Sequence, residues 1–260
     1  MTVSSKDNPQ VKRWRQLSAD GHFRRKQGRF ACEGARLCAD ALLSGLTVET
    51  VLYTAHAAKP YAAQLLPLLA AAKTTAEITP ELARYMADTA SPQGIFCVFK
   101  MPTLTAPVLS PSGRYLALED VQDPANLGTV IRTAEALGLD GLLMTGGCCD
   151  VYNPKVLRGS MGGVFRLPLL TVADFAAAIP TWQETGFYCF ACVPAAGAVS
   201  VCDAPLGDGS ILFIGNEGNG LKPETVAACR TAVTIPMAGR AESLNAAMAA
   251  GIVMWELKRR

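Results

Sequence analysis

Three loops hold the residues whose types and spacing could perform chemistry, and each of them follows an apolar run. The most informative has glycines at 215, 218 and 220 with Glu217 between them. Glycine turns after strands can hold pyrophosphate, but this order differs from G-x-G-x-x-G, and Glu217 places negative charge where a phosphate would bind. An NAD or ATP site is therefore disfavoured. A carboxylate beside exposed amides suits a ligand with hydroxyls and positive charge; a structural turn is the alternative.

The loop around Asp123 opens a helical pattern that includes Asn126 and Arg132. Asp123 followed by Pro124 is a favourable helix start, because the carboxylate lies near the positive end of the helix dipole. Arg132 falls outside the apolar stripe of this helix and points away from the local core. An ordinary surface arginine paired with Glu135 is the alternative.

The third loop runs from residue 234 into the last predicted helix, residues 244–258. Ser243 is placed to cap this helix, whose first amides would then be available to a ligand or substrate. Alanines and Gly251 give the helix small faces that another backbone could approach closely. A larger apolar stripe is formed by Leu244, Met248, Ile252 and Trp255.

Several chemistries are excluded by what the loops lack. His22 and His56 are the two histidines of the chain and lie outside the loops, so no Ser-His-Asp or Cys-His pair can be assembled there. Cys189 and Cys192 form a lone C-x-x-C on a predicted strand, without a second pair at zinc spacing. We therefore expect no metal.

The composition indicates a globular chain of 260 residues with enough apolar residues, 50%, to bury a core. No stretch approaches eighteen apolar residues and no secretory signal is recognised, so we expect no membrane segment. Nine scattered cysteines are typical of reduced thiols, and we expect a cytoplasmic protein.

Positive charge is concentrated at the start of the chain, although the net charge is only +2. Residues 1–29 carry eight of the 24 basic side chains and only two of the 22 acidic ones. Such a basic head indicates a polyanion partner, and a solvated amphipathic helix is the alternative. The residues expected to bind RNA are Lys12, Arg13, Arg15, Arg24, Arg25, Lys26 and Arg29.

Alternating helix and strand patterns must position these loops. A small α/β domain is expected over residues 1–100, with helices at 9–18, 33–43, 61–72 and 80–87, and strands at 29–32, 48–53, 95–100 and up to 78. Residues 101–113, with three prolines, form a linker. The domain over 114–260 has expected strands at 115–118, 141–144, 187–191, 211–214 and 232–235, and helices at 126–137, 154–161, 172–184, 223–229 and 244–258. This alternation favours a mostly parallel sheet with helices on both faces.

Taken together, residues 123–132, 214–221 and 235–245 resemble the three signature motifs of the SpoU (TrmH) family of S-adenosylmethionine-dependent RNA ribose 2′-O-methyltransferases, in the SPOUT superfamily. Residues 152–160 and 163–168 also resemble this family, so the resemblance covers residues 115–258. Ala125 replaces a glycine that is frequent in the first motif. Residues 9–100 look like the RNA substrate-binding domain of many members, similar to a ribosomal-protein L30e-like fold.

The resemblance implies a C-terminal α/β-knot domain, trefoil-knotted, which is an exception to the rule against knots. It also implies a homodimer whose active sites lie at the interface, and S-adenosylmethionine as the cofactor. The residues implied to bind this cofactor are Thr145, Gly146, Gly215, Asn216, Glu217, Gly218, Ile235, Pro236, Met237, Ser243, Leu244 and Asn245. The residues implied to be catalytic are Asn126, Arg132, Glu217, Ser243 and Asn245.

The reaction so implied is attack of a ribose 2′-hydroxyl on the methyl carbon, which demands alignment and polarisation of a reluctant proton. Arginine is a poor base in water, so Arg132 is expected to hold a substrate phosphate and to stabilise the forming alkoxide, oriented by Asn126. Glu217 would fix its loop, and Ser243 and Asn245 would position substrate and cofactor. Structured ribosomal RNA is the expected substrate; the alternatives are methylation of tRNA or of a base nitrogen, and an inactive RNA-binding protein.

Overall fold

The computed structural model describes residues 2–102, 109–195 and 197–260, so part of the expected linker, residues 103–108, lies outside the described residues. The chain divides into two compact units. One contains Met1–Thr103 together with Tyr152–Phe165, and the other contains Leu104–Val151 together with Arg166–Arg260. In the described parts of the chain, no helix is long and apolar enough to cross a membrane.

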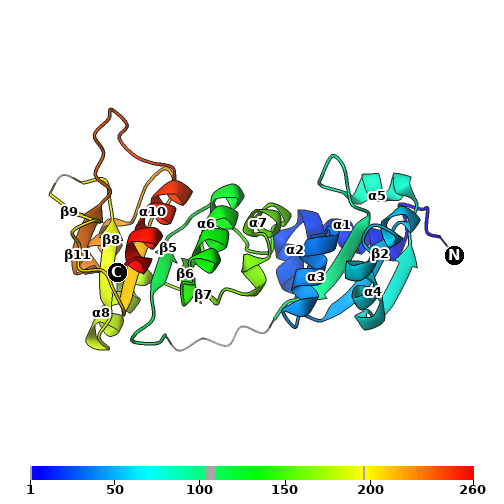
Figure 1. Cartoon of the computed structure of the whole chain (residues 1–260), viewed down its shortest axis with the longest axis horizontal. Helices are drawn as coiled ribbons and strands as arrows, with labels where there is room; N and C mark the ends of the chain where they lie inside the picture. The colour runs from blue at the N-terminus through cyan, green and yellow to red at the C-terminus, as the bar shows by residue number, and fades with distance from the viewer. Residues whose placement is uncertain (1, 103–108, 196) are drawn as a thin grey trace. The chain divides into compact units, whose positions relative to one another are not determined.

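The first unit is built on a mixed four-stranded sheet in the order β1-β4-β2-β3, of which β2 is labelled in Figure 1. β4 pairs antiparallel with β1 and with β2, whereas β2 and β3 are parallel. The strands are β1 (Arg29–Glu33), β2 (Val48–Tyr53), β3 (Thr74–Glu77) and β4 (Ile95–Lys100). The helices are α1 (Pro9–Ala19), α2 (Gly21–Gln27), α3 (Ala35–Leu43), α4 (Ala62–Ala71), α5 (Pro80–Met86) and α7 (Pro154–Ser160).

Regularly spaced apolar residues bury α1 in this unit, as its sequence pattern predicts. Val11, Trp14 and Leu17 are buried, and the Trp14 ring packs edge-on against Phe96 of β4 with centroids 5.1 Å apart. The basic run after residue 20, for which we expected no element, forms α2, because the Asp20 carboxylate accepts the His22 and Phe23 amides.

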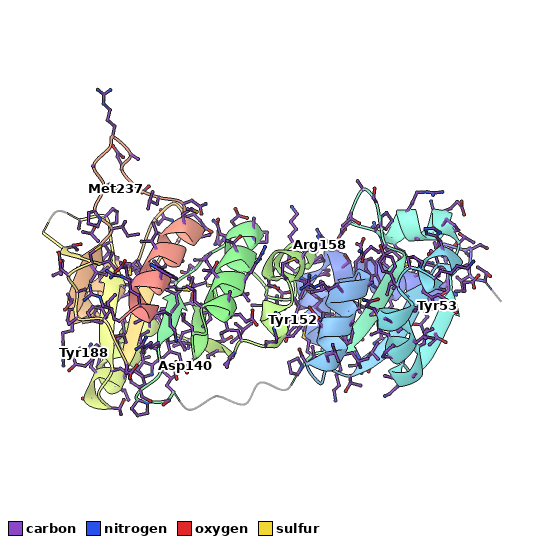
Figure 2. All side chains as sticks on the ribbon, in the orientation of Figure 1. Tyr53, Asp140, Tyr152, Arg158, Tyr188 and Met237 are labelled. Carbon is purple, nitrogen blue, oxygen red and sulfur yellow. The ribbon has the colours of Figure 1, made fainter. Side chains whose placement is uncertain are left out.

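Residues 152–165 belong to the first unit although they lie far along the chain. The Tyr152 ring stacks on Phe30 of β1 with centroids 4.6 Å apart, and Phe165 stacks on Phe30 at 6.0 Å. Figure 2 shows the side chains of Tyr152 and Arg158 in this segment. Aromatic stacking of this kind adds about 0.5–1.5 kcal/mol to the free energy of area burial, so this segment is anchored to β1.

The second unit is built on a seven-stranded sheet in the order β7-β6-β5-β10-β8-β11-β9, in which every pair is parallel. This confirms the expected parallel sheet. The strands are β5 (Tyr115–Leu118), β6 (Gly141–Thr145), β7 (Leu169–Val172), β8 (Tyr188–Cys192), β9 (Val199–Ser200), β10 (Ser210–Ile214) and β11 (Thr231–Thr234). The helices are α6 (Pro124–Ala136), α8 (Phe175–Glu184), α9 (Pro223–Ala228) and α10 (Ala246–Lys258).

Side chains from both faces of this sheet are buried. Tyr115, Ala117 and Phe213 pack with α8, while α6 and α10 pack against each other and against the sheet (Figure 1). The strand order changes direction between β5 and β10. Ligands of open parallel sheets bind beyond the carboxyl ends of the strands near such a point.

Two helices of the second unit begin later in the chain than the sequence predicts. The helix expected over residues 172–184 begins only at Phe175, capped by Asp174, because residues 169–172 add β7 beside β6. The last helix begins at Ala246 and its cap is Asn245, whose Oδ1 accepts the amides of Ala247 and Met248. The expected cap by Ser243 is therefore wrong, because Asn245 already satisfies the orphan amides of this helix.

Candidate active site

A cavity of about 460 Å³ lies beyond the carboxyl ends of β8, β10 and β11. It is bounded by the turn after β10, the loop between β11 and α10, and the first half of α10. Its lining residues include Gly215, Asn216, Glu217, Gly218, Ile235, Met237, Ser243 and Leu244, all expected from the sequence. Met237 lies on the β11–α10 loop (Figure 2). The structure thus brings together the second and third signature motifs around one cavity.

The turn after β10 is closed by its own backbone. Asn216 and Gly220 exchange two N–H···O bonds, of 3.0 and 2.9 Å, across the turn. The Asn216 Oδ1 atom accepts the amides of Gly218 (2.9 Å) and Asn219 (3.1 Å). A Cβ atom on Gly215 would lie 2.0 Å from the carbonyl carbon of Gly220, so glycine is required for this close approach.

Side chains from all three signature motifs meet in one hydrogen-bonded chain. Asn126 Nδ2 donates to Glu217 Oε1 (3.0 Å), and Asn245 Nδ2 donates to Asn126 Oδ1 (2.9 Å). Glu217 also accepts the backbone amides of Gln122 (3.2 Å) and Asp123 (3.1 Å). Asn126 is only 6% exposed, so its amide is committed to this chain. The expected cluster of Asn126, Glu217 and Asn245 is therefore present.

The same contacts determine the charge state of Glu217. Partial burial raises its pKa, but the hydrogen bonds from Asn126 and from backbone amides outweigh this effect and hold the pKa below its usual value. An ordinary glutamate has a pKa of about 4.3, so Glu217 is ionised at neutral pH. The stabilisation it gives the motif junction is fully present above that value and is lost as the pH falls through the lower, folded-state pKa.

Arg132 is exposed on α6, as the sequence predicts. Its guanidinium makes no hydrogen bond or ion pair within the part of the chain that the structure describes, because Glu135 pairs instead with Arg166 (2.7 Å). The expected orientation of Arg132 by Asn126 is not observed, since Asn126 bonds Glu217 and Asn245. The positively charged guanidinium group of Arg132 therefore faces outward.

The remaining expected cofactor residues lie outside the cavity lining. Thr145 Oγ1 donates to the Asp120 carboxylate (2.7 Å) and accepts the Asp120 amide (2.8 Å), so this side chain supports the β5–α6 connection instead. Gly146, next to Thr145, Pro236 and Asn245 do not line the cavity either. Asn245 acts indirectly, through its cap and its bond to Asn126.

Two acidic residues that the sequence analysis did not single out hold the exit of the glycine turn. Glu119, at the end of β5 and only 2% exposed, accepts Thr225 Oγ1 (2.6 Å) and the Lys222 amide (2.8 Å). Asp120 pairs with Lys222 Nζ (3.0 Å), and its carbonyl accepts Asn216 Nδ2 (2.8 Å). The Asp120 pKa is lowered by hydrogen bonds from Thr145 and Lys222. The glycine turn is therefore fixed from both sides.

Cys192, Val193 and Pro194 also line the cavity and were missed, although the end of a strand beside β10 was the available signal. Burial raises the pKa of Cys192, as of Cys189, to about 12, so both are protonated thiols at neutral pH. Within the described residues, no group of three potential metal ligands occurs.

The expected RNA-binding cations differ in their availability. Arg13 and Arg29 share the Glu49 carboxylate (3.2 and 2.9 Å), Lys12 pairs with Asp7 (2.7 Å), and Arg15 lies over the Tyr85 ring. Any phosphate must compete with these partners. Arg25 and Lys26 are exposed and lack such partners among the described residues.

Arg24 does not fit the expected role. It is 3% exposed, and its Nη1 atom donates to the carbonyls of Leu17 (2.8 Å) and Ser18 (3.0 Å) at the end of α1. It therefore satisfies the C-terminal carbonyls of a helix rather than facing RNA, a role that cations fill well because of the helix dipole.

We expect replacement of both Arg25 and Lys26 by Ala to weaken RNA binding without base preference. Each lost phosphate contact reduces the slope of log affinity against log salt by about 0.7–0.9, so the slope should fall by about 1.4–1.8. Filter binding to rRNA at several salt concentrations measures this. An unchanged slope would show that α2 is only a solvated face.

Arg24→Ala should instead lower the unfolding temperature.

Comparison with known proteins gives matches to two families, to curated relatives and to a solved structure. The SpoU rRNA Methylase family matches residues 113–255, and the MRM3-like substrate binding domain matches residues 8–97. The chain is 29% identical over 256 residues to the 23S rRNA (guanosine(2553)-2′-O)-methyltransferase RlmP of Bacillus subtilis, covering 98% of each chain. It is 30% identical to the 23S rRNA (uridine(2479)-2′-O)-methyltransferase of Streptomyces viridochromogenes, covering 97% of this chain and 90% of the relative. An AdoMet-bound rRNA methyltransferase from Sinorhizobium meliloti superposes with a TM-score of 0.86 and 30% identity, covering 100% of this chain and 97% of the neighbour.

Proposed function

Because the chain belongs to the SpoU rRNA methylase family, we propose that it transfers the methyl group of S-adenosylmethionine to a ribose 2′-hydroxyl of ribosomal RNA. The observation that carries this proposal is the chain of hydrogen bonds from Glu217 through Asn126 to Asn245, which joins the three signature motifs beside one cavity. An RNA-binding protein without catalysis has no need of this junction.

The cavity fits the cofactor by its chemistry. Its lining combines apolar side chains, backbone amides of the glycine turn, and the carboxylates of Glu217 and Glu242, and among the described residues no Lys or Arg lines it. A sulfonium ligand with ribose hydroxyls is suited to such a site, whereas the phosphates of NAD or ATP are not. When bound, S-adenosylmethionine supplies an electrophilic methyl group on a positively charged sulfur.

Protein groups then align the nucleophile and support its loss of a proton. We assign Arg132 to the substrate, donating two parallel N–H···O bonds to a phosphate or stabilising negative charge on the 2′-oxygen. Glu217 and Asn126 hold the first two motifs together, and Asn245 ties the third motif to them. Ser243, which lines the cavity, is assigned to substrate or cofactor positioning.

A homodimer is part of this proposal and is supported by the surface of α10. Met248 (61% exposed) and Trp255 (59% exposed) lie on its outer face, while Ala247, Ala250 and Val253 are buried. Exposed apolar stripes of this kind mark interaction sites. α10 packs against α6, the helix that carries Arg132. We assign the exposed Arg132 of one copy to the cavity of its partner.

The finer features of the fold are proposed on the same basis. Family membership supports a trefoil knot in the domain over residues 114–260 and an L30e-like fold over residues 1–100, connected by residues 101–113. The first domain would bind RNA and the second would transfer the methyl group. The nine cysteines are free thiols, which supports a cytoplasmic location.

Methyl transfer can be measured with tritiated S-adenosylmethionine and RNA from cells that lack the gene. We expect tritium to enter 23S rRNA and to be much lower in rRNA from cells that express the gene, whose acceptor hydroxyl is already methylated. Purified tRNA from the same cells is the comparison. Tritium that entered tRNA and not rRNA would overturn the assignment of the RNA class.

A further inference from the structure

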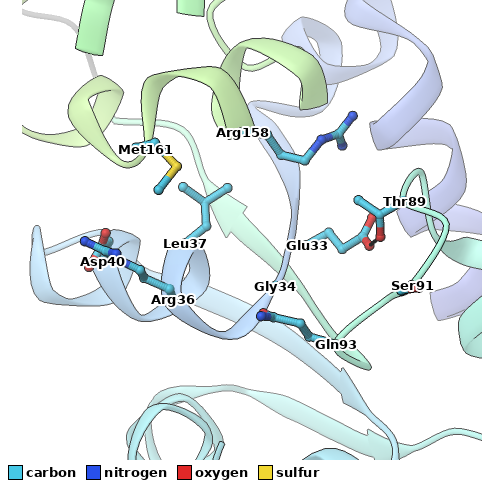
Figure 3. A pocket seen from close by; sticks show the side chains of 10 residues that line it. All are labelled: Glu33, Gly34, Arg36, Leu37, Asp40, Thr89, Ser91, Gln93, Arg158 and Met161. Carbon is cyan, nitrogen blue, oxygen red and sulfur yellow. Dashed lines mark hydrogen bonds between the residues drawn. The ribbon is translucent and has the colours of Figure 1, made fainter. Parts of the chain in front are cut away.

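A second cavity, of about 350 Å³, lies in the first unit and belongs to none of the three signature motifs (Figure 3). Its volume is within the range of small-ligand sites. It is lined by Glu33, Gly34, Arg36, Leu37, Asp40, Thr89, Ser91, Gln93, Arg158 and Met161. Arg158 and Met161 come from the segment anchored on β1, and the other residues lie between Glu33 and Gln93.

The N-terminus of α3 opens into this cavity with unfilled donors. Gly34 has φ +103°, and α3 has no cap from its own N-cap side chain. Gln93 Oε1 accepts the Ala35 amide (2.7 Å) in place of that cap. The next two amides, of Arg36 and Leu37, have no acceptor within the described parts of the chain. Free amides at a helix N-terminus favour an anion.

The acidic groups of the cavity are already engaged. Both Glu33 oxygens are used by the loop opposite, which donates the Asp88 amide (3.0 Å) and the Thr89 hydroxyl (2.5 Å). Asp40 also has a partner. These contacts hold the walls of the cavity together. The polar groups of the cavity that still lack a hydrogen-bond partner are therefore mainly donors.

Two guanidinium groups add to this donor set. Arg36 is exposed and has no ion pair among the described residues. The Arg158 guanidinium forms an ion pair with the Asp88 carboxylate at 3.7 Å, which is too long for a hydrogen bond, so its buried Nη1 atom has no hydrogen-bond acceptor among the described residues. Guanidinium groups with unfilled hydrogen-bond donors beside free helix amides are a suitable environment for a phosphate.

The cavity also has an apolar wall, which a bound phosphate would not contact favourably. Leu37 from α3 and Met161 just after α7 point toward one another in Figure 3. Met161 is 43% exposed and has φ +50°, a conformation that a residue with its side chain adopts at a cost. Methionine sulfur and methyl groups make favourable contacts with aromatic rings. The cavity thus pairs an anion site with an apolar surface suited to a base.

We propose that this cavity receives one unpaired nucleotide of the RNA substrate, other than the methylated one. Its phosphate lies at the start of α3 beside Arg36, and its base lies on Leu37 and Met161, within reach of the Gln93 amide nitrogen, which has no partner among the described residues. Unstacked bases are the features that proteins read in RNA. The inference rests on the proposed function for the identity of the RNA. It makes α7, a part of the methylase sequence, a component of substrate recognition.

The ligand can be tested without catalysis, in the full chain labelled with ¹³C at the methionine methyl groups. Met161→Asn identifies the Met161 signal by its loss, and asparagine tolerates positive φ, so this variant should stay folded. We expect AMP, GMP, CMP or UMP to shift the Met161 signal, and Arg36→Ala to weaken this binding by about tenfold. Lys73→Ala, at an exposed site of the same unit outside the cavity, should change nothing.

Inorganic phosphate and ribose 5-phosphate serve as probes for the anion site alone. If they bind as tightly as the nucleotides, the base has no role and the proposal is wrong. If no nucleotide shifts the Met161 signal, the cavity is not a nucleotide site. Saturating S-adenosylmethionine should leave the Met161 signal unshifted, since its cavity is separate.

Catalysis gives an independent readout. Met161→Asn should raise KM for rRNA by about tenfold, the loss of one base contact, with kcat and cofactor affinity unchanged. An unchanged KM contradicts the proposal. If the native chain transfers no methyl group to rRNA, the proposed function fails, whereas the nucleotide titration still decides whether the cavity binds.

Discussion

Arg132→Ala should abolish detectable methyl transfer while leaving the affinity for S-adenosylmethionine unchanged. Arg132 is exposed and unpaired among the described residues and does not line the cofactor cavity, so its removal disturbs neither folding nor cofactor binding. Loss of one group that stabilises transition-state charge lowers kcat by about 10²–10³. Single-turnover kinetics together with calorimetry of cofactor binding measure both quantities.

Arg230→Ala is the matched control, because Arg230 is an exposed arginine of the same unit that lies over the Tyr188 ring. It should retain activity. Arg132→Lys keeps the charge and loses the bidentate fork, so partial activity is expected. A loss of cofactor affinity in Arg132→Ala would contradict the assignment of Arg132 to the substrate.

Gly215→Ala should eliminate cofactor binding, with a loss of affinity of at least about 100-fold, equivalent to about 2.7 kcal/mol. The new Cβ would lie 2.0 Å from the Gly220 carbonyl carbon and 2.1 Å from the Leu221 nitrogen. Both atoms are backbone, so the turn must open. Opening it removes the amides of the glycine turn from the cavity. Calorimetry with S-adenosylmethionine tests this.

Gly218→Ala is the control for Gly215→Ala within the same turn. Its Cβ would meet only Asn216 Oδ1, at 3.5 Å, which is ordinary contact. Cofactor affinity should therefore change little. If both variants bind the cofactor like the native chain, the glycine turn is not the cofactor site.

The two inactive variants together test whether each site is shared between subunits. Mixed dimers of Arg132→Ala with Gly215→Ala would contain one site with both defects and one with neither. Activity should then return in part after subunit exchange. Activity that stays at background in verified mixed dimers would contradict a composite site.

The sequence predicts the parallel sheet because apolar runs of strand length alternate with helical patterns. The sequence also identifies Gly215, Glu217 and Asn126. The first two follow a predicted strand, and Asn126 lies at the start of a predicted helix. The family resemblance implies Thr145 as a cofactor residue. Its hydroxyl bonds Asp120 across two strands, a contact that depends on the register of β5 against β6.

Other features depend on tertiary partners that a linear pattern does not contain. Ser243 and Asn245 are both good caps, and Asn245 is the observed cap while its amide also reaches Asn126. Arg24 is one cation in a basic run, yet its neighbours Leu17 and Ser18 place it against carbonyl groups. Glu119 supports the glycine turn only because the fold brings the Lys222 amide and the Thr225 hydroxyl to its carboxylate.

The central claim, methylation of one ribose 2′-hydroxyl in ribosomal RNA, is tested most directly by alkaline hydrolysis. A methylated 2′-oxygen cannot attack its neighbouring phosphate, so the modified position resists cleavage. Ribosomal RNA from cells lacking the gene should gain a single gap in its hydrolysis ladder after incubation with the protein and S-adenosylmethionine. The same gap should be present in RNA from cells that express the gene. A ladder without any gap, despite methyl incorporation, would place the methyl group on a base and contradict the account.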